Sequence, residues 1–248
     1  MKRIGILGSR NLSYKILQWI VGQDYVDIIG VVTPPFQGWW KDKLIHIAKD
    51  NKLQVFESIE ELLEQKPDIV FSINYWKIIS KEHIDLVEGG IVNIHHSYLL
   101  KYRGRYSTSW AIANARKLSN WQHGTTLHYI SPELDAGPII DSYKCEITES
   151  DTAKTLFTRV EGLAYEMFVC NFKKIIENSI TTFLKQDPDF FYYDIDSNKN
   201  LEIEYGDPIE DVYDFVRAWT FNDRPLPYFN YKGEKIFLNI KSKNTEEV

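Results

Sequence analysis

Cysteine is scarce in this chain, because only Cys145 and Cys170 occur among its 248 residues. With no CxxC spacing, the sequence offers neither a disulfide framework nor a cysteine-based zinc site. Long apolar runs are also missing, and no stretch approaches the roughly 18–20 residues that a membrane helix requires. The first residues resemble a buried strand and a glycine turn rather than a secretory signal. We therefore expect a cytoplasmic protein without a membrane segment.

Basic residues are outnumbered by acidic ones, since 29 Lys and Arg face 35 Asp and Glu and the net charge is −6. A protein that binds nucleic acid generally presents a basic face, so we expect no nucleic-acid partner. An acidic chain can still contain a local cationic pocket. The length and the hydrophobic fraction of 44% are ordinary for a globular protein with a substantial core.

Short apolar segments alternate with segments of helical periodicity in the first third of the chain. Val26–Val32 is almost wholly apolar, which is typical of a parallel strand buried on both faces. The alternation predicts a Rossmann-like α/β fold, in which a mostly parallel sheet is flanked by helices. The expected strands are 3–7, 26–32, 54–56, 69–73, 91–95, 125–130 and 139–147. The expected helices are 12–20, 41–51, 59–65, 109–115 and 152–178.

Composition changes after residue 185, and we expect a catalytic domain over 1–185 and a small α+β extension over 186–248. The extension should contain a strand at 201–205 and a helix that ends near residue 219. A hairpin is expected at its end, with strands Tyr228–Tyr231 and Glu234–Ile240 and a turn at Lys232-Gly233.

Capping residues mark the starts of two expected helices. Ser150 or Asp151 is expected to cap the long helix that begins at Thr152. Asp207 is expected as the N-cap of the helix in the extension. Pro208 then takes the first helical position and Glu210 the third, where a side chain can reach back to the cap.

Polar residues just after buried strands are the first candidates for chemistry, because ligands of an open parallel sheet lie beyond the carboxyl ends of its strands. Asn93 and His95 end one expected strand, and strand alternation places both on the same side. An amide can stabilise an oxyanion and an imidazole can move a proton, as acyl transfer requires. The alternative is a turn asparagine beside a core histidine. His96 should point the opposite way and support the site from behind.

Two further groups could serve such a site. Lys101, Arg103 and Arg105 place three cations within five residues, and in an extended segment their alternate spacing could aim all three at a phosphate. A solvated basic loop is the alternative. Asp135 heads a Gly-Pro turn between two expected strands and could orient an imidazole, as the acid of a catalytic triad does. A turn aspartate that bonds its own backbone is the alternative there.

Three segments in this order resemble the formyltransferases that use 10-formyltetrahydrofolate: Asn93 through Arg105, Gly124 through His128, and Leu134 through Gly137. The resemblance is strongest over about 66–165. That family includes methionyl-tRNA formyltransferase, glycinamide ribonucleotide formyltransferase and the nucleotide-sugar N-formyltransferases. The resemblance implies a formyl transfer with N10-formyltetrahydrofolate as donor co-substrate and without a metal.

The resemblance also implies roles for individual residues. It makes Asn93, His95 and Asp135 the catalytic set. Two positions depart from the family's Ser-Leu-Leu-Pro-x-Tyr-Arg-Gly segment, because Tyr98 replaces the first leucine and Leu100 replaces the proline. The segment 74–79 resembles the strand end whose backbone receives the folate pterin. The residues implied for the folate site are Tyr75, Trp76, Lys77, Ile78, Ser97 and Leu99.

The acceptor implied by the resemblance is the amine of a nucleotide-linked amino sugar. Lys101, Tyr102, Arg103 and Arg105 resemble the substrate-binding segment of the nucleotide-sugar enzymes, whose arginine at the Arg105 position meets the diphosphate. The favoured acceptor is dTDP-4-amino-4,6-dideoxyglucose, ahead of the 3-amino isomer and a uridine-linked pentose. A role in lipopolysaccharide biosynthesis and a homodimer formed through the C-terminal extension are expected on the same basis.

Two other functions stay open from the sequence. A formyltetrahydrofolate hydrolase would keep the folate site and use water as acceptor, but it would need no arginines for a phosphate. A non-catalytic or redox dinucleotide-binding module would suit the fold. However, Gly5-Ile6-Leu7-Gly8 lacks the GxGxxG fingerprint, and no acid follows the second expected strand at Thr33-Pro34-Pro35.

Overall fold

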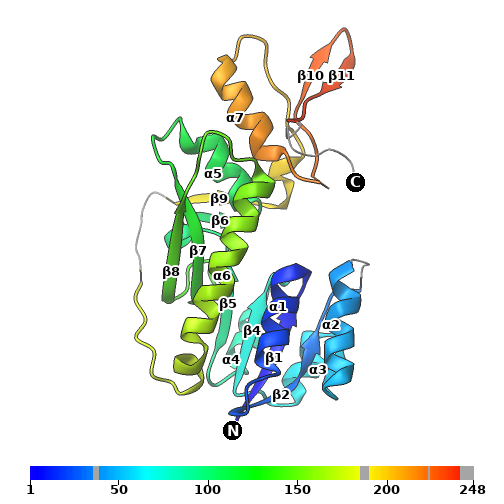
Figure 1. Ribbon diagram of the computed structural model, residues 1–248, viewed down its shortest axis with the longest axis vertical. Helices are drawn as coiled ribbons and strands as arrows, with labels where there is room; N and C mark the ends of the chain where they lie inside the picture. Colours follow the sequence, from blue (N-terminus) through cyan, green and yellow to red (C-terminus); the bar gives the residue numbers. More distant parts are fainter. Residues whose placement is uncertain (36–38, 185–189, 223, 241–248) are drawn as a thin grey trace.

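A seven-stranded sheet forms the centre of the computed structural model, which describes residues 1–35, 39–184, 190–222 and 224–240 (Figure 1). Its strand order is β3-β2-β1-β4-β5-β7-β8. The first five strands run parallel, and β7 and β8 are antiparallel to their neighbours. The prediction of a mostly parallel α/β sheet is confirmed. The strands are β1 (Lys2–Gly8), β2 (Val26–Val32), β3 (Gln54–Phe56), β4 (Ile69–Ile73), β5 (Ile91–His95), β7 (Gln122–Tyr129) and β8 (Ile139–Glu146).

Helices cover both faces of this sheet. One face packs against α1 (Arg10–Ile20), α2 (Trp39–Asp50) and α6 (Ala153–Ile176). On that face the rings of Phe71 and Phe168 meet edge to face with centroids 5.2 Å apart. The other face packs against α3 (Ile59–Glu64) and the short α4 (Lys81–Asp85). Burial on both faces explains why β4 is entirely apolar apart from Ser72.

The remaining elements lie at one end of the molecule, where α7 and the last hairpin extend beyond the sheet (Figure 1). A second core joins them to the sheet domain, and in it Trp219 is completely buried. The predicted domain boundary between residues 185 and 186 lies outside the described residues. The elements are the 3-10 turn η1 (Tyr98–Leu100), β6 (Tyr102–Gly104), α5 (Ser107–Ala115), β9 (Phe191–Tyr193), the 3-10 turn η2 (Ile195–Asn198), α7 (Ile209–Trp219), β10 (Tyr228–Tyr231) and β11 (Glu234–Phe237).

Both predictions of helix caps are wrong. Thr152 is the N-cap of α6 and forms a reciprocal capping box with Thr155. Asp151 is instead held by Arg159, whose Nη2 lies 2.8 Å from its Oδ1. Pro208 takes the N-cap position of α7, and Asp207 accepts a hydrogen bond from the backbone of Glu204 rather than from the helix. In both cases an acidic side chain next to the helix has a competing partner that the local sequence pattern does not reveal.

The strand predicted at 201–205 is not formed as a strand. Its backbone makes one isolated bridge between Glu202 and Tyr228. Side chains compete for the next amide groups, since the backbone N–H of Glu202 donates to Asn200 and that of Glu204 to Asp207. The predicted hairpin is present, with β11 ending at Phe237 rather than at residue 240.

Candidate active site

The carboxyl end of β5 carries the candidate site. Asn93 and His95 are both half-buried and are separated by the buried Ile94, so they share one face of the strand. β5 pairs with β7 in antiparallel register, which sets Asn93 opposite His128 and His95 opposite Thr126. The polar residues at the end of β5 therefore lie beside polar residues of β7.

His95 lies between two oxygen acceptors. Its Nδ1 is 3.6 Å from Asp135 Oδ2, and its Nε2 donates to the carbonyl oxygen of Tyr102 over 2.6 Å. The side chains of His95 and Asp135 are each 11% exposed, so solvent screens their interaction only weakly. Because the carbonyl of Tyr102 can only accept, Nε2 carries a proton, while Nδ1 faces the Asp135 carboxylate at a distance too long for a hydrogen bond. The structure thus brings together an imidazole and a carboxylate that lie far apart in the sequence.

Asn93 is oriented by His128, a residue to which the sequence reasoning gave no role. The Nδ2 of Asn93 donates to Nε2 of His128 over 3.1 Å, and Nδ1 of His128 lies 2.9 Å from the carbonyl of Tyr129. That carbonyl can only accept, so Nδ1 carries the proton and Nε2 accepts from Asn93. Burial, more than any other effect, lowers the pKa of His128 to about 4 and keeps the ring neutral. One amide hydrogen of Asn93 is left for a ligand.

The turn between β7 and β8 holds Asp135 toward the site. Asp135 has a left-handed backbone with φ of 47°, and its Oδ2 accepts from the backbone N–H of Gly104 over 2.9 Å. Two glycines permit this approach. A Cβ at Gly137 would lie 1.8 Å from the carbonyl of Tyr129, and one at Gly104 would lie 2.1 Å from that of Tyr193. The Gly-Pro turn therefore reverses the chain and also lets it pass close to the backbone of Tyr129.

The three predicted cations have three different neighbours. Arg103 pairs with Glu133 at 2.7 Å and stacks on the ring of Phe190. Lys101 lies over the ring of Phe191, and the exposed Arg105 donates to the carbonyl of Trp76 over 3.3 Å. The three side chains have separate contacts, with Glu133, with β9 and with Trp76, and their common direction toward a phosphate stays a prediction.

Tyr102 is also placed differently from its predicted role in substrate binding. Its side chain is 1% exposed and stacks on Phe191 with centroids 5.3 Å apart. Only its backbone carbonyl reaches the site, through His95. The residue therefore contributes to the core between β6 and β9, while its main chain touches the candidate catalytic group.

The predicted folate segment forms an aromatic loop after β4. The rings of Tyr75 and Trp76 lie 4.4 Å apart, the ammonium group of Lys77 lies 5.8 Å from the Trp76 ring, and Ile78 is 81% exposed. Arg105 joins this loop to the cationic segment.

The two folate-site residues predicted in the following turn are less accessible. Ser97 is completely buried, and its hydroxyl accepts from the backbone N–H of Tyr102. The backbone N–H of Leu99 is engaged by Ser142.

His96 points away from this face, as strand alternation requires. It is 7% exposed, packs edge to face on Phe157, and burial lowers its pKa to about 3. Its Nε2 has no hydrogen-bond partner in the described part of the chain. A neutral histidine behind His95 adds no charge to the site.

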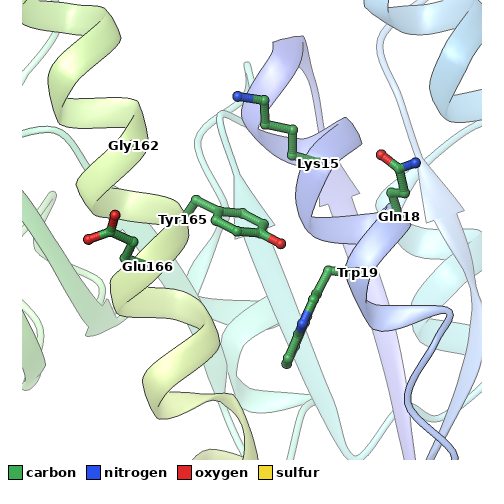
Figure 2. A pocket seen from close by; sticks show the side chains of 6 residues that line it. All are labelled: Lys15, Gln18, Trp19, Gly162, Tyr165 and Glu166. Atoms are coloured by element: carbon green, nitrogen blue, oxygen red, sulfur yellow. The ribbon is translucent and has the colours of Figure 1, made fainter.

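Two surface pockets lie elsewhere. One of about 420 Å³ opens between α1 and α6 and is lined by Trp19, Tyr165, Lys15 and Glu166 (Figure 2). Another of about 860 Å³ lies beside α3 and α4 and is rich in acidic residues. Neither lining includes Asn93, His95 or Asp135, so the chemistry is located by side-chain geometry rather than by these hollows. Among the described residues, no cluster of metal-ligating side chains occurs and no helix is long and apolar enough to cross a membrane.

Two curated proteins are similar to this chain over most of its length. The chain is 26% identical over 263 residues to the methionyl-tRNA formyltransferase of Bacillus velezensis, covering 100% of this chain and 79% of that protein. It is 32% identical over 189 residues to the bifunctional polymyxin resistance protein ArnA of Wigglesworthia glossinidia brevipalpis, covering 75% of this chain and 27% of that protein.

Solved structures match most of the chain. A 4-N formyltransferase from Francisella tularensis has a TM-score of 0.82 over 98% of this chain and 99% of its own, at 19% identity. WlaRD, a sugar 3N-formyl transferase solved with dTDP and 5-N-formyl-THF, has a TM-score of 0.76 at 26% identity over 95% and 85% of the two chains. The N-formyltransferase from Helicobacter canadensis, solved with folinic acid and dTDP-3-aminofucose, has a TM-score of 0.79 at 26% identity over 95% and 86%.

The family signature described as "Formyl transferase" matches residues 27–171, which include β5, the turn that carries Asp135, and most of α6. This chain belongs to the formyl transferase family.

Proposed function

We propose that this protein transfers the formyl group of N10-formyltetrahydrofolate to the amine of a nucleotide-linked amino sugar, with dTDP-4-amino-4,6-dideoxyglucose as acceptor. The observation that carries the proposal is the meeting of Asn93, His95 and Asp135 at the end of β5, in a chain of the formyl transferase family. The set contains an amide donor, an imidazole and a carboxylate, and it is shielded from solvent on most sides.

The chemistry assigns one task to each side chain. The unprotonated sugar amine attacks the formyl carbon, and Asn93 uses its remaining amide hydrogen to stabilise the oxyanion that develops on the formyl oxygen. His95 takes the proton that the attacking amine loses and passes it to the departing folate nitrogen, and Asp135 stabilises the imidazolium that forms between these two transfers. Such an oxyanion contact is worth about 10²–10³ in rate, and a positioned proton transfer about 10²–10⁴.

The residues present fit a folate donor. Asn74 follows β4, has a left-handed backbone, and keeps a buried Nδ2 that has no partner among the described residues. The next two residues, Tyr75 and Trp76, offer aromatic surface. A heteroaromatic ring with acceptor atoms would satisfy the amide and stack on the rings. When bound there, the donor supplies the activated formyl group.

Three arginines could bind the diphosphate of the nucleotide-linked sugar. Arg105 is exposed beside the aromatic loop. Arg10 and Arg224 repel each other electrostatically, and Arg10 also interacts with the carboxyl group of Glu161, although neither arginine forms an ion pair within 4 Å in the described ranges. Burial, with Arg10 adding to it, lowers the pKa of Arg224 to about 10. Arg10 starts α1, and the hydroxyl of Ser9 donates to the carbonyl of Asn74 instead of capping the helix. A diphosphate would relieve this repulsion and bind the helix N-terminus.

The position of the acceptor amine is the finer part of the proposal. The two solved relatives at 26% identity are described with a 3-amino sugar or as a 3N-formyl transferase, so the 3-amino isomer is the competing acceptor. We also propose a homodimer formed through the C-terminal extension, whose exposed apolar side chains include Tyr231 and Phe237 at 51% and 59% exposure.

Product analysis tests the function. The purified protein is mixed with 10-formyltetrahydrofolate and, in parallel reactions, with the 4-amino sugar nucleotide, the 3-amino isomer, or no sugar. We expect tetrahydrofolate release only with the sugar, fastest with the 4-amino compound, together with an N-formylated sugar by mass spectrometry. Equal release without sugar would show a hydrolase instead. Light scattering of the wild type and of Phe237→Lys tests the dimer, which the lysine should split.

A further inference from the structure

A strained turn connects β5 to β6 directly beside the candidate site. Leu99 and Leu100 have left-handed backbones in succession, with φ of 49° and 57°. Residues other than glycine, asparagine and aspartate rarely adopt this conformation, and two in a row persist only when surrounding contacts hold them. Leu100 also stands where the resembling family has proline, whose ring fixes φ near −65°. The turn therefore has a shape that proline cannot take.

Hydroxyl groups of β7 and β8 form hydrogen-bond contacts with this turn. The backbone N–H of Leu99 donates to Ser142 Oγ over 3.1 Å, and Ser142 Oγ lies 2.8 Å from Thr126 Oγ1. Thr126 Oγ1 donates in turn to the carbonyl of Ser97 over 2.6 Å. These hydrogen bonds begin and end on the same turn, so β8 holds the turn at Leu99 and β7 holds it at Ser97. Thr126 and Ser97 are completely buried, so water does not compete for the hydrogen bond between them, whereas Ser142 is partly exposed.

The far end of the turn reaches His95. The hydroxyl of Ser97 accepts from the backbone N–H of Tyr102 over 2.7 Å, which fixes that peptide. The carbonyl of the same residue accepts from His95 Nε2 over 2.6 Å. A displacement of the turn therefore moves the acceptor of His95 directly, while the contact of its Nδ1 with Asp135 belongs to another loop.

We propose that Ser142 and Thr126 are positioning residues that set the orientation of the His95 ring through the Ser97–Tyr102 turn. The inference rests on the proposed function, since it takes His95 as the reacting imidazole. Among the described residues, the Ser142 side chain makes hydrogen-bond contacts with Leu99, Thr126 and the carbonyl of Thr125 and with none of Asn93, His95 and Asp135, so its effect on His95 is indirect.

The first test removes the hydroxyl group and restores it. Ser142→Ala should lower kcat about tenfold or more and shift the pH profile of kcat, with the KM for the sugar nucleotide changed less than about twofold. Ser142→Thr returns a hydroxyl and should recover most of kcat. Thr155→Ala is the control, because it removes the hydroxyl contact of an exposed threonine with the buried Asp151 at the start of α6. It should lower the melting temperature comparably and leave kcat and its pH profile unchanged.

The second test does not depend on turnover. The ring nitrogens of His95 are observed by NMR in protein labelled with ¹⁵N-histidine while the pH is varied. Ser142→Ala and Thr126→Val should each change the titration of His95, and the double variant should be no worse than the more severe single variant because both break the same series of hydrogen bonds. An unchanged His95 titration, or kinetics like those of Thr155→Ala, would overturn the inference. Absence of formyl transfer by the wild type would refute the proposed function alone, because the NMR comparison still stands.

Discussion

Acidification should destabilise this protein well before its carboxylates are titrated, because three buried histidines stay neutral in the folded state. Burial lowers the pKa of His96 and His123 to about 3 and that of His128 to about 4. An unfolded histidine has a pKa of about 6.5. As the pH falls below about 6.5, the unfolded chain binds protons that the folded protein does not, so the free energy of unfolding decreases.

The size of this effect follows from the pKa difference. At pH 5.5 each buried histidine removes about 1.4 kcal/mol of stability, and the three together remove about 4 kcal/mol relative to pH 8. The loss for each ring grows until the pH approaches its folded pKa. Native domains have about 5–15 kcal/mol of net stability, so the effect is a large fraction of the total.

Urea unfolding followed by tryptophan fluorescence measures this loss of stability at low pH. The free energy of unfolding is determined at pH 8, 6.5 and 5.5 for the wild type, for His123→Leu, and for His46→Gln as the control. His46 is 77% exposed, so its replacement shows what the loss of a surface histidine does. His123→Leu should reduce the loss between pH 8 and pH 5.5 by about 1.4 kcal/mol. A free energy of unfolding that stays within about 1 kcal/mol over this range would refute the reasoning.

Three further predictions concern the site. Asp135→Asn keeps the shape of the side chain but removes the charge beside His95, and it should lower kcat by about 10²–10⁴ while binding of the nucleotide stays near normal; a kcat within twofold of wild type would contradict this. Arg105→Ala should raise the KM for the sugar nucleotide about tenfold or more and leave the folate KM almost unchanged, since a charge-assisted hydrogen bond contributes about 1.5–3 kcal/mol; equal effects on both would remove its role at the diphosphate. Gly104→Ala places a Cβ 2.1 Å from the carbonyl of Tyr193 at a φ of +82°, so calorimetry should show a lower melting temperature; unchanged stability would argue against this close approach.

The fold could be predicted from the sequence because its signals are local. A run such as Val26–Val32 is apolar enough to indicate a buried parallel strand without knowledge of its neighbours. The caps could not be assigned in this way. Asp151 is a good capping residue by type, but Arg159 lies close enough in space to engage it first. The choice between two partners of one carboxylate depends on tertiary distances.

The site shows the same division. Asn93 and His95 could be paired from strand alternation alone, since both positions belong to one strand. His128 could not be placed, because its contact with Asn93 depends on the antiparallel register between β5 and β7. The three cations could not be oriented either, because Glu133 and the rings of β9 come from distant parts of the chain. A contact between residues of two different strands or loops can be predicted only when the packing of those segments against each other is known.

The most direct test of the account follows the formyl carbon itself. Wild-type protein and Asn93→Ala are each incubated with 10-[¹³C]formyltetrahydrofolate and the 4-amino sugar nucleotide, and the label is located by NMR. The account predicts a ¹³C-formamide on the sugar nitrogen with the wild type, and a rate at least about 10²-fold lower with the variant. Label recovered as free formate, or undiminished transfer by Asn93→Ala, would contradict it.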